Sequence, residues 1–221
     1  MIKFNHVSKV YPNGQKSLDN VNLNISQGEM VFVTGHSGAG KSTLLKMIAC
    51  LERPSAGNIT IKNKDLSDLK LKQLPIYRRR IGFVYQDNLL LPDYTVFDNV
   101  ALALKIQGSD ITEIHSRTNA ALEKVGLRAY RNSYPSDLSA GEQQRVGIAR
   151  AVVHRPLIIL ADEPTGNLDS KLSLDILHTF SDFNKVGTTV VIATHDLDII
   201  KKIKSRLIEL KNGVLIRDIY Q

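Results

Sequence analysis

The sequence predicts an α/β fold built on a mostly parallel β-sheet. Two runs of residues, 157–161 and 189–193, are almost wholly apolar, which is typical of parallel strands covered on both faces. Apolar residues recur at helical spacing after each run, over 172–183 and 197–203. A glycine-rich loop, 35–40, separates an apolar run from an amphipathic one. A strand, a glycine loop and a helix in that order are typical of an α/β domain that holds an anion at the helix N-terminus.

Short strands are expected in the N-terminal third and at the C-terminal end. Pro12-Asn13-Gly14 predicts the turn between the first two strands, and the predicted fold therefore includes an N-terminal antiparallel β subdomain. A last hairpin, 206–216, is expected to turn on Asn212-Gly213, because this dipeptide accepts the two positive φ angles of a tight hairpin turn. The other expected strands are 2–11, 21–25, 30–33, 58–62 and 81–85.

The middle of the chain predicts a helical insertion into this α/β core. Over 96–153 the apolar residues recur at roughly helical spacing. Breakers at Gly108-Ser109 and Pro135-Ser136 divide the segment into separate helices. We therefore expect one domain over 1–221, with a core of 1–86 and 156–221 and a helical subdomain of 87–155.

Composition favours a cytosolic protein without a membrane span of its own. The 221 residues are 43% hydrophobic, yet no run of 18 apolar residues occurs and the N-terminus lacks the apolar stretch of a signal peptide. Cys50 is the single cysteine, so neither an internal disulfide nor a cysteine metal cluster is expected. The net charge of +7 fits an acidic neighbour, and the basic clusters at 62–80 and 201–206 fit either such a neighbour or simply solvated faces.

The glycine-rich loop carries the most specific motif of the chain. Residues 35–43 fit the pattern G-x-x-x-x-G-K-[ST], whose glycines let backbone N–H groups curl around a phosphate. Lys41 is placed to reach the β- and γ-phosphates of a nucleotide, and the Ser42 hydroxyl to ligate Mg²⁺. The expected phosphate-binding residues are Gly35, His36, Ser37, Gly38, Ala39, Gly40, Lys41, Ser42 and Thr43.

Two carboxylates follow the apolar run 157–161. A carboxylate at the C-terminal end of a parallel strand points into the ligand crevice of the sheet. We expect Asp162 to hold the Mg²⁺ ion with its water shell, and Glu163 to orient and deprotonate the attacking water. Together with the glycine loop, this pair predicts a P-loop nucleoside triphosphatase fold and activity.

The stretch 138–145, Leu-Ser-Ala-Gly-Glu-Gln-Gln-Arg, begins a helix. Ser139 is a good N-cap and Glu142 completes a capping box, so the stretch has a purely structural interpretation as well. It also resembles the signature sequence of ATP-binding cassette ATPases. That resemblance implies that Ser139 and Gly141 of one chain bind the γ-phosphate of the ATP held by a second chain, in a homodimer that closes on ATP. Ala140 and Glu142 depart from the usual signature, although neither removes a backbone N–H donor.

Further marks of this family occur in the expected order. Gln86 resembles the glutamine that contacts Mg²⁺ and the attacking water, and His195 resembles the histidine that contacts the γ-phosphate. Tyr11 has the place of the aromatic residue that stacks on adenine. Residues 166–169, Gly-Asn-Leu-Asp, resemble the loop that crosses the dimer interface.

The resemblance covers the whole chain and is greatest to the cell-division members of the family. His36 within the glycine loop and the run 52–57, Glu-Arg-Pro-Ser-Ala-Gly, carry the finer likeness. It implies a subunit that hydrolyses Mg²⁺-ATP and drives an FtsX-like integral membrane protein that regulates septal cell-wall hydrolysis. The chain would then lie in the cytoplasm, on the inner face of the bacterial plasma membrane, held there by its partner.

Other functions remain as alternatives. The alternative is the ATPase subunit of a lipoprotein-release or macrolide-type exporter, because 162–169 is shared with those ATPases. A DNA-repair ATPase would carry long coiled coils, and no sustained heptads occur, so no nucleic-acid partner is expected. An ATP-binding regulator without turnover fits poorly with the presence of Glu163 and His195. The apolar stretch 88–92, Asn-Leu-Leu-Leu-Pro, is interpreted either as core or as the surface that docks the membrane partner.

Overall fold

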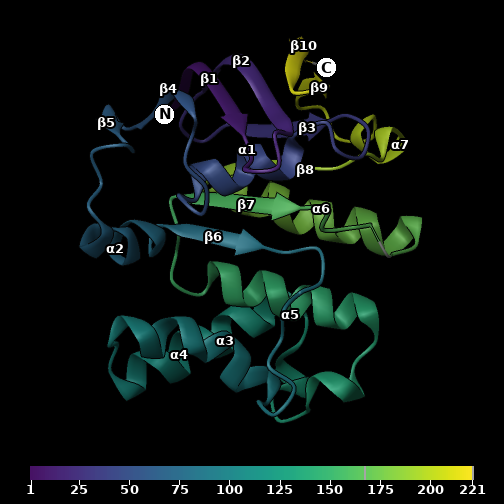
Figure 1. Cartoon of the computed structure of the whole chain (residues 1–221). Coiled ribbons are helices and arrows are strands. Elements are labelled where there is room, and N and C mark those ends of the chain that lie inside the picture. The colour runs from purple at the N-terminus through teal and green to yellow at the C-terminus, as the bar shows by residue number, and fades with distance from the viewer. Residues whose placement is uncertain (167, 221) are drawn as a thin grey trace.

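The computed structural model describes residues 1–166 and 168–220, and its two β-sheets lie on either side of helix α1 (Lys41–Ile48) (Figure 1). The larger sheet has six strands and is parallel except for its edge strand β10. In spatial order its strands are β10 (Val214–Tyr220), β9 (Arg206–Lys211), β3 (Met30–Thr34), β8 (Thr189–Ala193), β7 (Ile158–Asp162) and β6 (Ile81–Val84).

Successive residues of the central strands point to opposite faces of the large sheet, and both faces are buried. In β3, Val31 and Val33 pack with α1 and the smaller sheet, whereas Phe32 packs with the helices on the other face. In β7, Leu160 lies on the α1 face and Ile159 on the helical face. Because both faces are covered, these strands carry no alternation of polar residues, and the predicted α/β fold is confirmed.

The smaller sheet is antiparallel and has four strands, as expected for the N-terminal third. Its second strand begins at Lys16, five residues before the predicted start at 21, because the bulged register at Asn20 (φ +48°) interrupts the alternation. Strand β5 and helix α2 (Leu74–Arg78) were not predicted, since α2 has no buried residue and β5 is only two residues long. In spatial order the strands are β2 (Lys16–Ile25), β1 (Ile2–Val10), β4 (Ala56–Ile61) and β5 (Lys64–Asp65).

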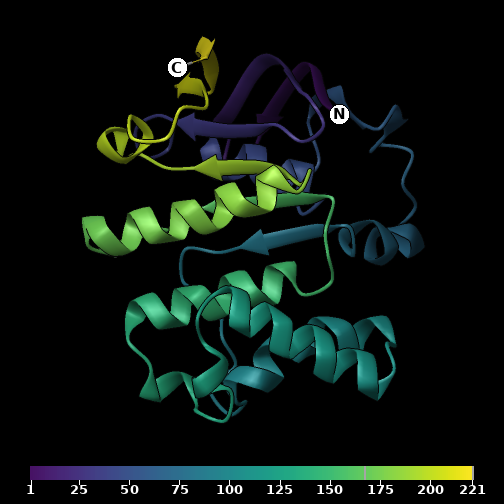
Figure 2. The ribbon, with the colours of Figure 1, turned by 180° about the vertical axis from the view of Figure 1, so that it is seen from behind.

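Helices cover the second face of the large sheet and extend beyond its β6 edge. Figure 2 shows α6 running along that face, where Ile176, Leu177 and Phe180 are buried, while α3, α4 and α5 gather next to β6. Gly108, with φ +78°, ends α3 at the predicted break. Helix α7 ends at Ile200, three residues before its predicted end. The bounds are α3 (Val96–Gln107), α4 (Ile111–Lys124), α5 (Ala140–Val152), α6 (Ser170–Lys185) and α7 (Leu197–Ile200), with 3₁₀ turns at Leu71–Gln73, Arg128–Tyr130 and Pro135–Asp137.

The C-terminal hairpin forms as predicted. Asn212 and Gly213 have φ angles of +50° and +80°, which match the right-handed twist of the flanking strands. Strand β10 continues to Tyr220, four residues beyond the predicted end of the hairpin. Among the described residues, no helix combines the length and the apolar character that crossing a bilayer requires.

Candidate active site

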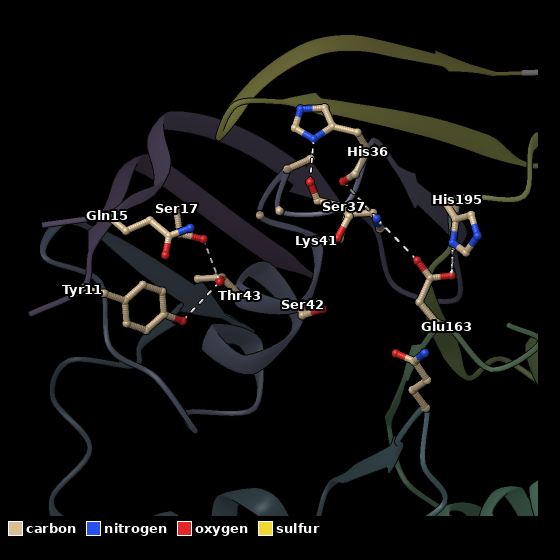
Figure 3. A pocket seen from close by; sticks show the side chains of 14 residues that line it. Tyr11, Gln15, Ser17, His36, Ser37, Lys41, Ser42, Thr43, Glu163 and His195 are labelled. Carbon is tan, nitrogen blue, oxygen red and sulfur yellow. Dashed lines mark hydrogen bonds and ion pairs between the residues drawn. The ribbon is translucent and has the colours of Figure 1, made fainter. Parts of the chain in front are cut away.

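Four parallel strands of the large sheet have their C-terminal ends on the same side of the molecule, and each is followed by residues predicted for the site. Strand β3 leads into the glycine loop, β6 towards Gln86, β7 into Glu163 and β8 towards His195. The C-terminal ends of these strands border a pocket of about 520 Å³ (Figure 3). The residues that line it are Tyr11, Gln15, Ser17, His36, Ser37, Gly38, Ala39, Gly40, Lys41, Ser42, Thr43, Gln86, Glu163 and His195.

The glycine loop lies so close to neighbouring backbone that two of its positions require glycine. A Cβ atom at Gly35 would lie 2.2 Å from the carbonyl oxygen of Leu210, and one at Gly40 would lie 2.4 Å from that of Ser17. Gly40 also has a φ of +105°, a conformation that other residues rarely adopt. The loop is therefore fixed between the C-terminal hairpin and β2, and it leads directly into the first turn of α1.

Lys41, the first residue of α1, points its ammonium group back into the loop. Its Nζ donates hydrogen bonds to the carbonyl oxygens of Gly35 at 2.8 Å and His36 at 3.3 Å, and it lies 3.4 Å from Oε1 of Glu163. Only 7% of the side chain is exposed. A cation held in this way presents a fixed positive charge at a helix N-terminus, where anions are favoured.

Glu163 is held between Lys41 and His195 by the backbone and by its own carboxylate. Its N–H donates to the carbonyl of Ala193 at 2.9 Å, and its φ of +48° is unusual for a residue with a side chain. Oε2 accepts hydrogen bonds from Nδ1 of His195 at 2.9 Å and from the His195 N–H at 3.3 Å. The unusual backbone angle therefore directs a largely buried carboxylate at the loop lysine, the kind of local strain that is concentrated at functional sites.

Ser42 and Asp162 form a second polar pair behind the loop. The Ser42 hydroxyl donates to Oδ1 of Asp162 at 3.0 Å. Burial raises the pKa of the Asp162 carboxyl, the Ser42 hydrogen bond opposes this shift, and the neighbouring charge of Glu163 adds to it. A hydroxyl and a carboxylate are hard oxygen ligands of the kind that Mg²⁺ prefers, and the amide oxygen of Gln86 is a third donor of this class.

Ser42 and Asp162 suit a magnesium ion better than they suit a metal ion whose ligands are all protein side chains. No group of three or more His, Cys, Asp or Glu side chains capable of holding a metal occurs within 1–166 and 168–220. Mg²⁺ usually keeps several waters and binds through one or two protein ligands together with substrate phosphates. The oxygen donors beside the phosphate loop match that pattern.

Tyr11 and its neighbours form the side of the pocket that lies across from Glu163 and His195 (Figure 3). The Tyr11 hydroxyl lies 3.2 Å from Oγ1 of Thr43, which also accepts a hydrogen bond from Ser17 at 2.8 Å. Nζ of Lys9 lies 5.1 Å from the centre of the tyrosine ring. Tyr11 follows β1 instead of ending it, so the predicted strand 2–11 is one residue too long. The sequence interpretation missed the pocket residues Gln15 and Ser17, which have no motif around them.

His36 connects the glycine loop to the C-terminal hairpin. Its Nδ1 lies 2.6 Å from the carbonyl oxygen of Ser37, and its Nε2 lies 3.1 Å from Oδ1 of Asn212. Asn212 was predicted only as a turn residue, and nothing in the local sequence indicates this contact across the fold. The side chain at position 36 therefore helps to fix the loop that surrounds Lys41.

Ser139 and Gly141 do not line the pocket in the part of the chain that the structure describes. Ser139 caps α5, and Oε2 of Glu142 accepts hydrogen bonds from the Ser139 hydroxyl at 2.7 Å and N–H at 2.9 Å, which lower the pKa of the Glu142 carboxyl. The predicted capping box is thus confirmed. Ser139 and Ala140 are exposed, whereas Gly141 is buried, and a Cβ there would lie 3.1 Å from Leu172.

Part of the predicted interface loop can be placed beside this helix. Asn167 lies outside the described residues. Asp169 caps α6 by accepting hydrogen bonds from the N–H groups of Lys171 and Leu172, at 2.9 and 3.0 Å. Gly141 of α5 therefore packs against the same first turn of α6 that Asp169 caps.

A glycine loop with a buried lysine, followed at the same sheet edge by two carboxylates, defines a P-loop nucleotide-binding fold. Residues 18–166 match the sequence model of the ABC transporter family. The chain therefore belongs to the ABC transporter family, and it is an ATP-binding cassette ATPase, as the resemblance of its motifs implied.

Relatives of known sequence match the chain from end to end. It is 53% identical over 215 residues to the cell division ATP-binding protein FtsE of Escherichia coli K12, a match that covers 97% of each chain. The FtsE protein of Bacillus subtilis is 47% identical over 99% of this chain and 96% of its own length. The methionine import ATP-binding protein MetN 1 of Listeria monocytogenes is 44% identical over 98% of this chain, but over only 65% of its own length.

Solved structures of ATP-binding cassettes have the same fold. The dimeric post-hydrolysis structure of the cassette MJ0796, bound to ADP and phosphate, superposes with a TM-score of 0.91 at 40% identity, covering 100% of this chain and 98% of the other. A second dimeric structure of MJ0796, described as a bacterial ABC transporter cassette, also has a TM-score of 0.91, at 41% identity over the same shares of the two chains.

Proposed function

We propose that this chain is the ATPase subunit of a bacterial cell-division complex, in which it hydrolyses Mg²⁺-ATP between two copies of itself. The observation that carries the ATPase site is the placement of Glu163 between Lys41 and His195 at the end of the glycine loop. The cell-division role is supported by the end-to-end similarity to FtsE proteins at 47–53% identity. We also propose the division into a core, 1–86 and 156–221, and a helical subdomain, 87–155.

Binding of the nucleotide is assigned to the loop and to the tyrosine beside it. Backbone N–H groups of the loop and the ammonium of Lys41 hold the phosphates, and Thr43 and Ser17 orient Tyr11 for stacking on the adenine. Ser42, Gln86 and Asp162 hold Mg²⁺. The ion, when bound, supplies charge that stabilises the β- and γ-phosphates.

Catalysis in this proposal depends on Glu163 and on the groups that fix it. The carboxylate accepts a proton from the attacking water, which is general base catalysis. His195, through its bond to Oε2, orients the carboxylate and reaches towards the γ-phosphate. The rest of the barrier is lowered by positioning and by neutralisation of phosphate charge.

The second chain of the dimer supplies the signature helix. Because Ser139 and Ala140 are exposed at the N-terminus of α5 and lie outside the pocket, they are free to approach a nucleotide held by another copy. Ser139 and Gly141 of that copy then contact the γ-phosphate from the opposite side. The dimeric structures of the cassette MJ0796 support this arrangement.

Removing the ammonium of Lys41 tests the nucleotide site directly. Lys41→Ala is expected to weaken ATP binding by one to two decades, because a charge-assisted hydrogen bond contributes about 1.5–3 kcal/mol. Isothermal titration calorimetry measures the change, with Lys124→Ala on α4 as a matched lysine control on the helical side of the molecule. Equal affinities of Lys41→Ala and the wild type would contradict the assignment.

We propose an FtsX-like integral membrane protein as the partner, which holds the chain on the inner face of the membrane. The leucines after Gln86 provide the docking surface. Leu89 and Leu91 are 57% and 37% exposed, whereas Leu90 packs against the core. Leu90 therefore contributes to the core, and the exposure of Leu89 and Leu91 supports the proposal that these two residues contact the partner.

Hydrogen bonds from Arg150 hold the backbone at Leu89, one of the two exposed leucines. Arg150 of α5 donates to the carbonyl oxygens of Asn88 and Leu89, the second at 2.8 Å, and both residues have positive φ angles. The surface is thus connected to the helix that begins at the signature. That connection provides a route between the nucleotide and the partner.

Replacing Leu89 and Leu91 by serine is expected to abolish recruitment to membranes that carry the partner, with a melting temperature within a few degrees of wild type. Leu90→Ser is the matched control: it should lower the melting temperature by several degrees, since a loss of about 1–3 kcal/mol corresponds to about 2–4 °C per kcal/mol in a chain of this size. Thermal unfolding and membrane co-sedimentation measure the two properties. Unchanged recruitment of the folded double variant would rule out this docking surface.

A transporter ATPase is the alternative function. The 44% identity to a methionine import ATP-binding protein supports a role in transport, and the motif at 162–169 supports a lipoprotein-release or macrolide-type exporter. Affinity purification of the chain from its native membranes, followed by identification of the co-purified integral membrane protein, distinguishes the two. Recovery of a transporter permease instead of an FtsX-like protein would overturn the cell-division proposal.

A further inference from the structure

A second cavity, of about 290 Å³, lies at the end of the large sheet opposite to the active site. Ile81 and Ile158 line it, and they are the first residues of β6 and β7, whose other ends lead to Gln86 and Glu163. Helix α2 lies beside these strand starts, away from the arrowheads in Figure 1. The cavity is therefore separate from the nucleotide pocket.

The walls of this cavity are apolar and its mouth is partly open. Leu66 is buried, and Leu69 and Tyr77 are half-buried. Ile76 and Leu157 also line the cavity, although they are 58% and 40% exposed. Apolar side chains that converge on a space near the lower end of small-molecule site volumes provide a place for an apolar ligand body.

Helix α2 is anchored, so the cavity does not depend on a loose segment. The Tyr77 hydroxyl donates to the carbonyl of Ile48, and Arg78 donates to that of Cys50 at 2.8 Å. Ile48 is the last residue of α1, and Cys50 follows it by two residues. This helix therefore holds one wall of the cavity at a fixed position against α1.

Cations surround the mouth of the cavity without carboxylate partners. Lys62, Lys64 and Arg80 line it and are exposed, and none of the described residues that line it is acidic. Within 1–166 and 168–220, none of the three forms an ion pair. An apolar space with an uncompensated positive rim is complementary to a molecule with an apolar body and one anionic end.

We propose that this cavity binds an alkyl-chain anion, with the chain between α2 and the starts of β6 and β7 and the anionic group beside Lys62, Lys64 and Arg80. Two sources carry this chemistry, a free fatty acid and an anionic membrane lipid. The basic cluster 62–80 of the sequence then has a binding role in addition to being a solvated face.

Calorimetry with decanoate, at concentrations below micelle formation, tests the proposal on the full chain. We expect decanoate to bind saturably. Decanol, which has the same chain length without the charge, should bind with an affinity at least tenfold lower. Lys64→Glu combined with Arg80→Glu should weaken decanoate binding at least tenfold. Lys72→Glu is the matched control, because Lys72 lies in the same segment but does not line the cavity, and it should leave the affinity within twofold.

The position of the ligand is tested by isoleucine methyl NMR. Decanoate should shift the resonances of Ile76, Ile81 and Ile158, and leave unchanged that of Ile176, a buried residue of α6 that does not line the cavity. Co-sedimentation with phosphatidylglycerol vesicles shows whether the natural ligand is a membrane lipid or a free fatty acid. Vesicle binding that decanoate competes away indicates a membrane lipid. Decanoate binding without vesicle binding indicates a free fatty acid. Absence of saturable binding, equal affinity of the charge-reversed variant, or shifts confined to other methyl groups would overturn the proposal.

Discussion

Glu163→Gln is expected to slow ATP hydrolysis by roughly 10²–10⁴-fold while ATP still binds, because the amide has the size of the carboxylate but accepts no proton. The substitution keeps a side-chain oxygen for the 2.9 Å bond from His195, and the residue retains the same backbone conformation at φ +48°. It removes the ion pair with Lys41 at 3.4 Å, which leaves the ammonium available to phosphate. The measurement is steady-state phosphate release, alongside calorimetric ATP binding.

The matched control for this prediction is Glu123→Gln. Glu123 is an exposed carboxylate on α4 that pairs with Arg128, so its neutralisation should leave turnover unchanged. The ATP-bound dimer of Glu163→Gln should persist for longer than that of the wild type, because the step that reopens it is slowed. A turnover number close to that of the wild type in Glu163→Gln would remove this residue from the role of general base.

The parts of the fold that sequence predicted are those with a strong local signal. The buried strands at β7 and β8 are continuous apolar runs, and the Asn212-Gly213 turn and the Ser139 cap are motifs only a few residues long. The glycine loop is recognised from a motif of nine residues, although the contacts that require glycine at Gly35 and Gly40 come from Leu210 and Ser17, which the motif does not show. The apolar runs, the turn and the cap depend little on the remainder of the fold.

The features that sequence missed depend on contacts between distant segments. Asn212 bonds to His36, which is 176 positions earlier, and Ser17 of β2 bonds to Thr43 of α1, 26 positions later. Nothing near either residue in the sequence encodes its partner. The sequence also does not tell which of the three leucines after Gln86 is buried. In the structure Leu90 packs against the core, whereas Leu89 and Leu91 are exposed.

The arrangement of the dimer is tested best at Ala140. Gly141 is less suitable, since any side chain there would lie against Leu172 and alter the packing of α5 on α6. Ala140 is exposed at the first position of α5, where a carboxylate is favourable to the helix dipole, so Ala140→Asp should fold with an unchanged or slightly raised melting temperature. Ala140→Asn is the matched control, because it has almost the same shape without the charge.

We expect Ala140→Asp to bind ATP as a monomer but to lose dimer closure and almost all hydrolysis. If the signature of one chain faces the γ-phosphate of the other, the new carboxylate meets phosphate charge, and unit charges about 4 Å apart repel by about 4 kcal/mol at an effective dielectric constant of about 20. Size-exclusion chromatography with light scattering follows closure, and phosphate release follows turnover. Mixing Ala140→Asp with Lys41→Ala should restore activity, because a mixed dimer combines the intact loop of the first chain with the intact signature of the second in one working site. If instead Ala140→Asp alone hydrolyses ATP at the wild-type rate, or the mixture stays inactive, the site is not shared between two chains in this way.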